Sequence, residues 1–287
     1  MKQASAVATA RTALLLCAAA LCLLLQWPSP NLCAATTASQ PPASASQIVA
    51  TLLANEVAAS LHRDHYMYLS QERSNRTGGH LWTEKVVETS AGTLRLLIAE
   101  DGKPLSPQRI VLERARLAAI AADPAAFARK SQGQKDDEEH ARQMEPLVAK
   151  AFLFSDAGEE SGYLRIDFRP NPNYKTQSIE ERLMHGISGT LLIDPQAMRL
   201  RHMEGRLPQD VSIGFGILAK IRTGSNFSAT RDRPGVPEWK TTAYDTNFSG
   251  RILFFKSIVR NAHAEHSNFV PVPNDLSLAQ AVAMVEQ

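Results

Sequence analysis

The chain has 287 residues, of which 44% are hydrophobic and 21% are charged, and its formal net charge is +2. Lys2 and Arg11 account for that charge because no acidic residue lies in residues 1–35, so the rest of the chain is electrically balanced. This balance excludes a general electrostatic attraction to nucleic acid or to an anionic membrane.

Residues 1–35 have the layout of a secretory signal peptide. Lys2 and Arg11 form a basic segment, residues 12–25 form an uncharged run rich in Leu and Ala, and Cys33-Ala34-Ala35 offers small residues for cleavage. A membrane-spanning helix needs about 20 apolar residues, which is more than this run provides, so an uncleaved anchor is the less favoured alternative. We therefore expect cleavage near Ala35 and export to the periplasm or the extracellular space.

All cysteines of the chain, Cys17, Cys22 and Cys33, lie inside this predicted signal peptide. The exported chain is therefore expected to have no disulfide bond and no thiol chemistry, and to depend on an ordinary hydrophobic core. Each cysteine follows a leucine, whereas a lipid-attachment signal has a small residue in that place, so a lipoprotein is not expected.

The predicted elements begin after residues 36–46, a small and Pro-containing segment that we interpret as a flexible linker. We assign residues 47–287 to a single domain. Apolar residues at helical spacing predict a helix from Gln47 to about His62. Short connections rich in Gly, Asn and Asp then separate strand-like runs, which predict an antiparallel meander over residues 66–73, 81–88 and 93–100.

Residues 106–154 form a predicted helical block. From Met144 to Phe152 the apolar residues recur at i, i+3, i+4, i+7 and i+8, which indicates a face turned toward the core. The charged run at residues 135–139 is expected on the surface, with its acidic residues in the first turn of the helix that they precede.

After Gly158 the hydrophobic period changes to two, which predicts a long series of antiparallel strands. Residues 251–260 are apolar on both faces and are expected to form one strand that is buried on both sides. Residues 276–285 are expected to form a short helix. The predicted fold class is α+β, with a strongly curved antiparallel β-sheet, a half-barrel, wrapped around a helical block. Its later strands include residues 163–169, 190–193 and 198–203.

A Gly-x-Gly sequence at Gly214 and Gly216 raises the possibility of a phosphate-binding loop. Neither a third glycine nor a Gly-Lys-Ser/Thr tail follows it, and residues 217–222 continue the two-residue period. We therefore interpret residues 211–223 as one long strand, in which both glycines lie on one face and allow curvature or a shallow trough beside Leu218.

Candidate catalytic and metal-binding groups are few. His62 and His65 form a His-x-x-His pair, and His263 and His266 form another, but neither pair has a third ligand at a defined spacing. No Gly-x-Ser-x-Gly motif is present. We expect no metal, no cofactor and no enzymatic activity; the less favoured alternative is a secreted hydrolase in which His62, His65 or His263 meets a carboxylate only in the folded chain.

Large apolar residues fall on elements that are expected to share one interior. They could fill an ordinary core, which is the commoner fate of such residues, or leave an apolar cavity in an incompletely closed sheet. The second interpretation predicts that a hydrophobic ligand is lined by Phe152, Phe154, Phe168, Phe215, Leu218, Trp239 and Phe254.

The order of the predicted elements resembles that of the LolA/LppX/RseB group of envelope proteins over about residues 47–260. The best local similarities are YMYLSQER at residues 66–73, SGTLLIDPQAMRLRHME at residues 188–204 and GRILFFKSIV at residues 250–259. The resemblance implies a half-barrel that encloses lipid or lipoprotein acyl chains, with no site residue carried over.

Two functions follow from this resemblance. The first is an exported carrier or binding protein for a lipid, a lipoprotein acyl chain or another hydrophobic ligand, without catalysis. Such a carrier would bind the hydrophobic ligand or a lipidated protein, and an envelope membrane protein is a further candidate partner. Nucleic acid is not expected as a partner. The alternative is an envelope sensor or scaffold on the same fold, which acts through its surface.

Overall fold

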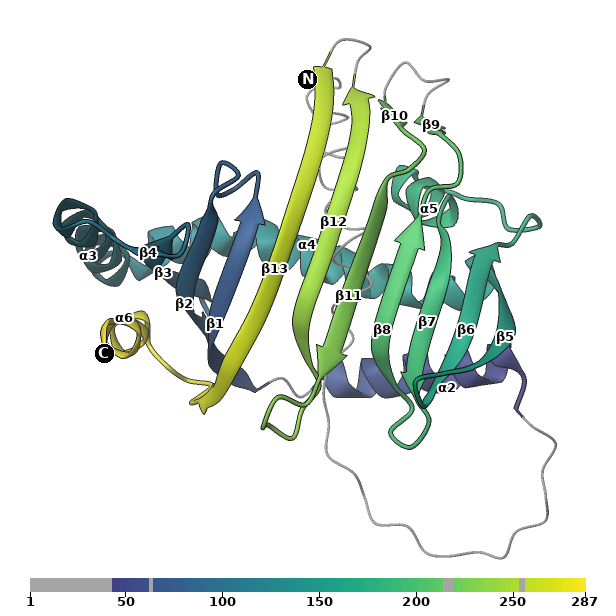
Figure 1. Ribbon diagram of the computed structural model, residues 1–287, viewed down its shortest axis with the longest axis horizontal. Helices are drawn as coiled ribbons and strands as arrows, with labels where there is room; N and C mark the ends of the chain where they lie inside the picture. Colours follow the sequence, from purple (N-terminus) through teal and green to yellow (C-terminus); the bar gives the residue numbers. More distant parts are fainter. Residues whose placement is uncertain (1–42, 62–63, 214–218, 253–255) are drawn as a thin grey trace, which may run out of the picture.

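One antiparallel sheet extends across the molecule and is accompanied by helices at both ends (Figure 1). The computed structural model describes residues 43–61, 64–213, 219–252 and 256–287. Over these residues the chain forms a sheet of 13 strands and five helices, and the path of strand pairing does not close on itself. A mixed helix and strand architecture built on a large antiparallel sheet is thereby confirmed.

The elements follow the predicted order of helix, meander, helices, further strands and helix. The helices are α2 (Ala45–Ser60), α3 (Pro107–Ala122), α4 (Pro124–Ala151), α5 (Ile179–His185) and α6 (Leu278–Glu286). The strands are β1 (His65–Ser74), β2 (Leu81–Thr89), β3 (Gly92–Glu100), β4 (Lys103–Pro104), β5 (Phe152–Glu160), β6 (Tyr163–Pro170), β7 (Ser188–Asp194), β8 (Arg199–Arg206), β9 (Val211–Ile213), β10 (Ala219–Ile221), β11 (Asn226–Asp232), β12 (Lys240–Ile252) and β13 (Lys256–Val272).

Strands from the two ends of the described chain meet in the middle of the sheet (Figure 1). β1 pairs antiparallel with β13, which places Ser70 opposite His266. The strand order is β4-β3-β2-β1-β13-β12-β11-β8-β7-β6-β5, and β10 also pairs with both β12 and β9. The β1–β13 pairing therefore joins the predicted meander to the later strands in one continuous sheet.

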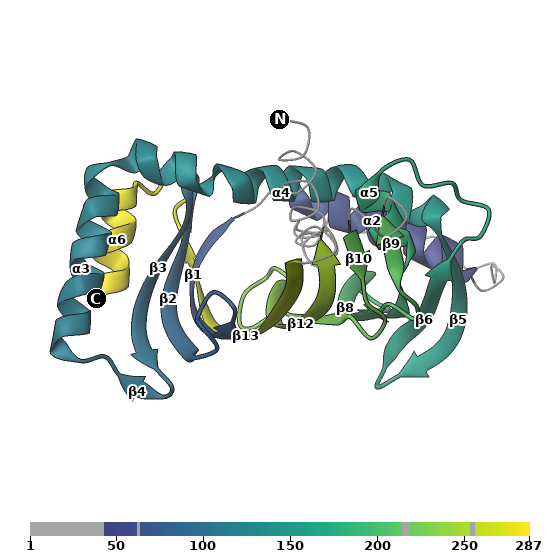
Figure 2. The ribbon, with the colours of Figure 1, turned by 90° about the horizontal axis from the view of Figure 1, so that it is seen from above.

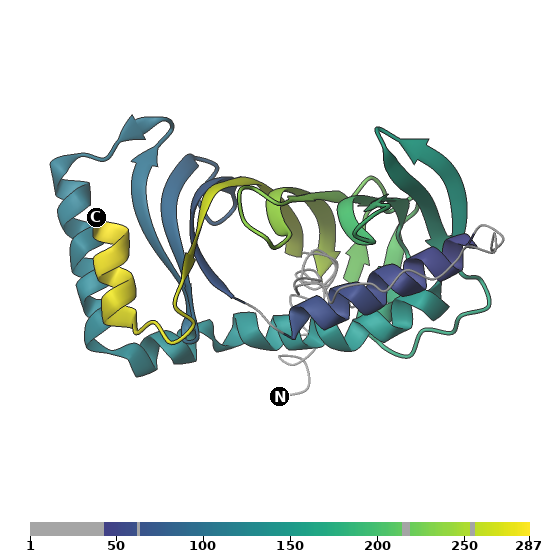
Figure 3. The ribbon, with the colours of Figure 1, turned by 90° about the horizontal axis from the view of Figure 1, so that it is seen from below.

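Two groups of helices pack at opposite ends of the sheet and on opposite faces of it. Figures 2 and 3 show α3 and α6 together at one end, α2 and α5 at the other, and α4 extending between them. Val87 packs with Leu94 in the core under α3 and α6, whereas the neighbouring Val86 faces the other way. Following the paired residues across the sheet places Val86 on the same face as Met203, which belongs to the core under α2.

Short polar residues cap the N-termini of the helices and explain where each helix begins. Ser44 and Gln47 form a capping box at α2: the Ser44 hydroxyl accepts from the Gln47 amide at 3.3 Å, and the Ser44 amide donates to Gln47 Oε1 at 2.8 Å. These contacts satisfy amides that the first turn of a helix leaves without partners. The other caps are Ser106, Asp123, Ser178 and Ser277.

The predicted helical block is confirmed, but its internal boundaries differ from the expectation. Asp123 caps a long α4 with Pro124 at its start, so residues 135–139 lie in the middle of that helix and not in its first turn. The helix ends at Ala151, and Phe152, which was expected on its apolar face, is the first residue of β5. Phe152 thus continues the apolar spacing of α4 although it already belongs to β5.

Two strand predictions are wrong for the same reason. Residues 211–223 contain two short strands, β9 and β10, that pair antiparallel with Ile213 opposite Ala219. Residues 251–260 likewise contain the end of β12 and the start of β13, and Val259 is 53% exposed. Paired residues of a hairpin lie on the same face, so when their sequence separation is even the two-residue period continues through the turn. Such a period cannot distinguish one long strand from two paired ones.

Candidate functional site

A buried ion cluster fixes α2 against the sheet. The carboxylate of Glu56, which is fully buried, accepts from Arg199 Nε at 2.9 Å and from Arg199 Nη2 at 2.8 Å. It also accepts from Arg231 Nη1 at 2.9 Å and from the Leu200 amide at 3.0 Å. Paired, hydrogen-bonded charges of this kind are tolerated in a low-dielectric interior, whereas a single one is not. The cluster therefore determines where α2 lies on β8 and β11.

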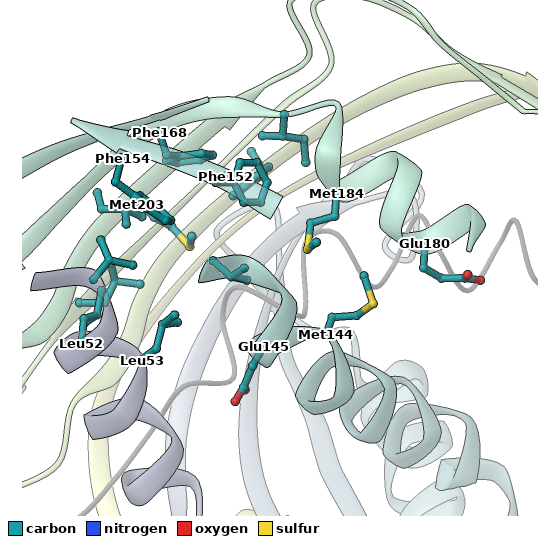
Figure 4. Close-up of a pocket in the computed structure, with 16 residues that line it drawn as sticks. Leu52, Leu53, Met144, Glu145, Phe152, Phe154, Phe168, Glu180, Met184 and Met203 are labelled. Carbon is teal, nitrogen blue, oxygen red and sulfur yellow. The ribbon is translucent and has the colours of Figure 1, made fainter. Parts of the chain in front are cut away.

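An apolar pocket lies beside this cluster, between the helices and the sheet (Figure 4). Its free volume is about 60 Å³. Its walls come from α2, α4, α5 and the strands β5–β8 and β11. The lining residues are Val49, Leu52, Leu53, Met144, Glu145, Val148, Phe152, Phe154, Phe168, Glu180, Met184, Ile187, Leu191, Leu200, Met203 and Phe227.

Three phenylalanines from adjacent strands form the aromatic wall of the pocket (Figure 4). Phe152 and Phe154 are two residues apart on β5 and therefore share a face, and Phe154 pairs with Phe168 of β6. The rings of Phe152 and Phe168 meet edge to face, with centroids 5.3 Å apart. This geometry favours a firm aromatic wall.

Gly205 makes room for a fourth phenylalanine, Phe227. Gly189 of β7 lies opposite Gly205 of β8, which in turn lies opposite Phe227 of β11. A Cβ added to Gly205 would lie only 2.5 Å from the Phe227 ring, whereas a Cβ added to Gly189 would overlap the backbone of Glu204. The lack of a side chain at Gly205 is thus a steric requirement of the aromatic packing. Gly214 and Gly216, for which curvature or a shallow trough was expected, lie outside the described residues.

Three methionines give the pocket adaptable walls. Met144 belongs to α4, Met184 to α5 and Met203 to β8, and Figure 4 shows Met144 and Met184 extending from their helices toward each other. An unbranched thioether side chain changes rotamer at low cost and fits irregular apolar shapes. The helical side of the pocket can therefore repack more readily than the aromatic side.

Two carboxyl groups accompany the apolar lining. Glu145 of α4 is 6% exposed, and its Oε1 atom is buried without a hydrogen-bond partner among the described residues. Burial raises the pKa of Glu145 to about 7 because the charged form loses its hydration. Figure 4 shows the carboxyl groups of Glu145 and Glu180 on the outer sides of the cluster, away from Phe152 and Phe168. The pocket is apolar inside and acidic at its margin.

The structure brings together some of the predicted ligand-lining residues and separates another. Phe152, Phe154 and Phe168 line one pocket, whereas Trp239 is buried elsewhere, with the guanidinium of Arg233 5.4 Å from its ring centroid. The remaining predicted lining residues, Phe215, Leu218 and Phe254, lie outside the described residues.

Sequence reasoning did not select the methionines or the acidic margin as parts of a site. Met144 was recognised only as a member of an apolar helical face. Met184 and Glu180 lie on α5, a helix of seven residues for which no signal was identified. The signal for α5 was Ser178 followed three residues later by Glu181, the pattern of a helix start, and the Glu181 amide donates to Ser178 Oγ at 3.0 Å.

The candidate catalytic histidines lie in different surroundings. His263 Nδ1 lies 2.7 Å from Asp245 Oδ1, but the two side chains are 49% and 55% exposed on neighbouring strands. His65 begins β1 and lines a second pocket, of about 280 Å³, whose lining also includes Glu88. His62 lies outside the described residues. His266 is half-buried, and burial lowers its pKa to about 4, so it is neutral at pH 7 and donates from Nδ1 to the Thr241 carbonyl at 3.1 Å. Over the part of the chain that the structure describes, no three His, Cys, Asp or Glu side chains gather as a metal site.

Comparisons with known proteins add no relative to this description. No family model, no curated protein and no solved structure matches the chain. Among the helices of the described segments, none is both long enough and apolar enough to span a membrane.

Proposed function

We propose that this chain is an exported carrier that binds the apolar chain of a lipid or of a lipidated protein between its sheet and its helices, without catalysis. The observation that carries the proposal is the pocket bounded by α2, α4 and α5, whose lining in the described part of the chain is apolar except for Glu145 and Glu180. The matching finer architecture is a strongly curved half-barrel around these helices, as in the LolA/LppX/RseB group, with the signal peptide directing export.

The small free volume implies that the pocket must widen when a ligand binds. Pockets that hold drug-sized ligands have volumes of about 300–1,000 Å³, whereas the free volume here is about 60 Å³. A long alkyl chain therefore needs the helices to move outward or Met144 and Met184 to change rotamer. Since α2 is held by Glu56 at its C-terminal part, the adaptable side is the one formed by α4 and α5.

A direct test is native mass spectrometry of the purified protein, followed by organic extraction, which should recover a bound lipid or acyl chain. A fluorescent apolar probe should also bind, and Leu53→Trp should weaken its binding by filling the pocket from α2. The matched control is Leu112→Trp on α3, where the leucine is 62% exposed and outside the pocket.

Two outcomes decide the proposal. Recovery of lipid, together with probe binding that Leu53→Trp weakens and Leu112→Trp leaves unchanged, would support it. A protein that carries no lipid and binds no probe would contradict it, and capture of an envelope membrane partner by that empty protein would favour the sensor alternative.

A further inference from the structure

The lining of the pocket is chemically one-sided. Of its sixteen residues, fourteen are apolar and two are carboxylic acids, and neither Lys, Arg nor His is among them. An apolar tail inside this pocket would therefore have its polar end beside carboxyl groups. The charge at the margin discriminates between head groups of opposite sign, because a charge interacts more strongly where the surroundings exclude water.

Glu145 is the buried acid of this pocket. It is 6% exposed, and Oε1 has no hydrogen-bond partner in the part of the chain that the structure describes. The charge of Arg142 on the same helix acts on Glu145, but this arginine is 47% exposed and forms an ion pair with Glu139 at 2.6 Å. A buried carboxyl oxygen without a donor costs free energy, which a donor group on a ligand would recover.

The surrounding charges do not supply that donor. Glu56 of α2 adds a negative charge that helps to raise the pKa of Glu145, and both arginines near Glu56 already donate to it. Glu180 of α5 is a second acid at the same pocket. The helices that bound the pocket thus present acids to its margin, and no basic side chain lines it.

We propose that this pocket selects amphipathic ligands with a cationic head, such as a primary ammonium group, and that the carboxyl group of Glu145 binds that head at the margin between α2 and α4. The inference rests on the proposed carrier function and specifies its ligand class. An ammonium group would donate to the unpartnered oxygen and neutralise the buried charge, whereas a carboxylate head would place two negative charges together. A hydroxyl head would donate without neutralising it and should bind with intermediate affinity.

The test is displacement of a fluorescent apolar probe by dodecylamine, dodecanol and dodecanoate, which share one chain length and differ in the head. The wild-type protein should bind the amine about tenfold or more tightly than the carboxylate, as expected for a charge-assisted hydrogen bond. Glu145→Gln should remove that preference, and circular dichroism of the variant checks that it is folded. The matched control is Glu265→Gln on β13, whose side chain is 62% exposed.

The outcomes separate this inference from the carrier function. Equal binding of all three ligands, unaltered by Glu145→Gln, would overturn the head-group assignment and leave the carrier intact. Selectivity that persists in Glu145→Gln would also overturn it, whatever the effect of Glu265→Gln. If none of the three displaces the probe, both the carrier function and the assignment fail.

Discussion

Arg231 and Glu56 form an ion pair in which both side chains are fully buried, with Nη1 2.9 Å from Oε2. The pair joins β11 to α2 across 175 residues of sequence, and Arg199 completes the cluster from β8. Because the pocket lies between α2 and the same strands, the cluster sets the geometry of the candidate site.

Glu56→Gln is therefore expected to destabilise the fold by about 3–5 kcal/mol, because two arginines lose their buried counter-charge. Urea unfolding monitored by circular dichroism measures this change. Glu139→Gln on α4, whose glutamate side chain is 53% exposed, should change the free energy of unfolding by less than about 0.5 kcal/mol. A similar small effect for both variants would contradict the structural role of the cluster.

Gly205→Ala should destabilise the protein by about 1–3 kcal/mol, because the new methyl group overlaps the ring of Phe227. Gly133 offers the opposite case: it lies inside α4, and an added Cβ meets nothing within 4 Å. Gly133→Ala should therefore stabilise the protein by up to about 1 kcal/mol. Thermal unfolding should show a lower melting temperature for Gly205→Ala and a higher one for Gly133→Ala than for the wild-type protein. Stabilisation by Gly205→Ala would contradict the steric argument.

The stability of the protein should depend on pH through Glu145. The unfolded chain releases this proton near the ordinary value of 4.5, and the folded chain releases it only at about 7. Glu145 therefore contributes fully to the free energy of unfolding below pH 4.5, and this contribution is lost as pH rises through 7. The loss is at most about 3 kcal/mol. Glu145→Gln should reduce the loss of stability between about pH 5 and about pH 8. An unchanged pH dependence of unfolding in that variant would contradict the burial of an unpartnered acid.

Cleavage of the predicted signal peptide should depend on a small residue at Ala35. When the chain is expressed in a bacterium, intact mass measurement should show a protein that begins after Ala35. Ala35→Phe should block that cleavage because signal peptides have small residues at this position, whereas Ala34→Phe, one residue earlier, should be processed normally. Retention of residues 1–35 in the wild-type protein would favour the uncleaved anchor.

Local patterns predicted most elements because their causes are local. The helical spacing after Gln47, the meander and the terminal helix near residues 276–285 all correspond to observed elements, α2, β1–β3 and α6. Phe152, Phe154 and Phe168 were also predicted as neighbours of one interior, and they line one pocket. In each case, the period of apolar residues is set by the geometry of the element that carries them.

Boundaries and hairpins were less predictable. The two-residue period continues from β9 into β10, so residues 211–223 were indistinguishable from one strand. The site was hidden for another reason: Glu56 and Arg199 are 143 residues apart, and no local rule pairs them.

By itself, the sequence determined most of the elements, their coarse order and a balanced charge beyond the predicted signal peptide, because these depend on composition and on neighbours along the chain. Only the tertiary structure decided that the central strands β1 and β13 pair, that Glu56 receives two arginines and that Oε1 of Glu145 has no hydrogen-bond partner among the described residues. The physical reason is that burial and ion pairing depend on distances in space, which strand pairing sets among residues far apart in sequence.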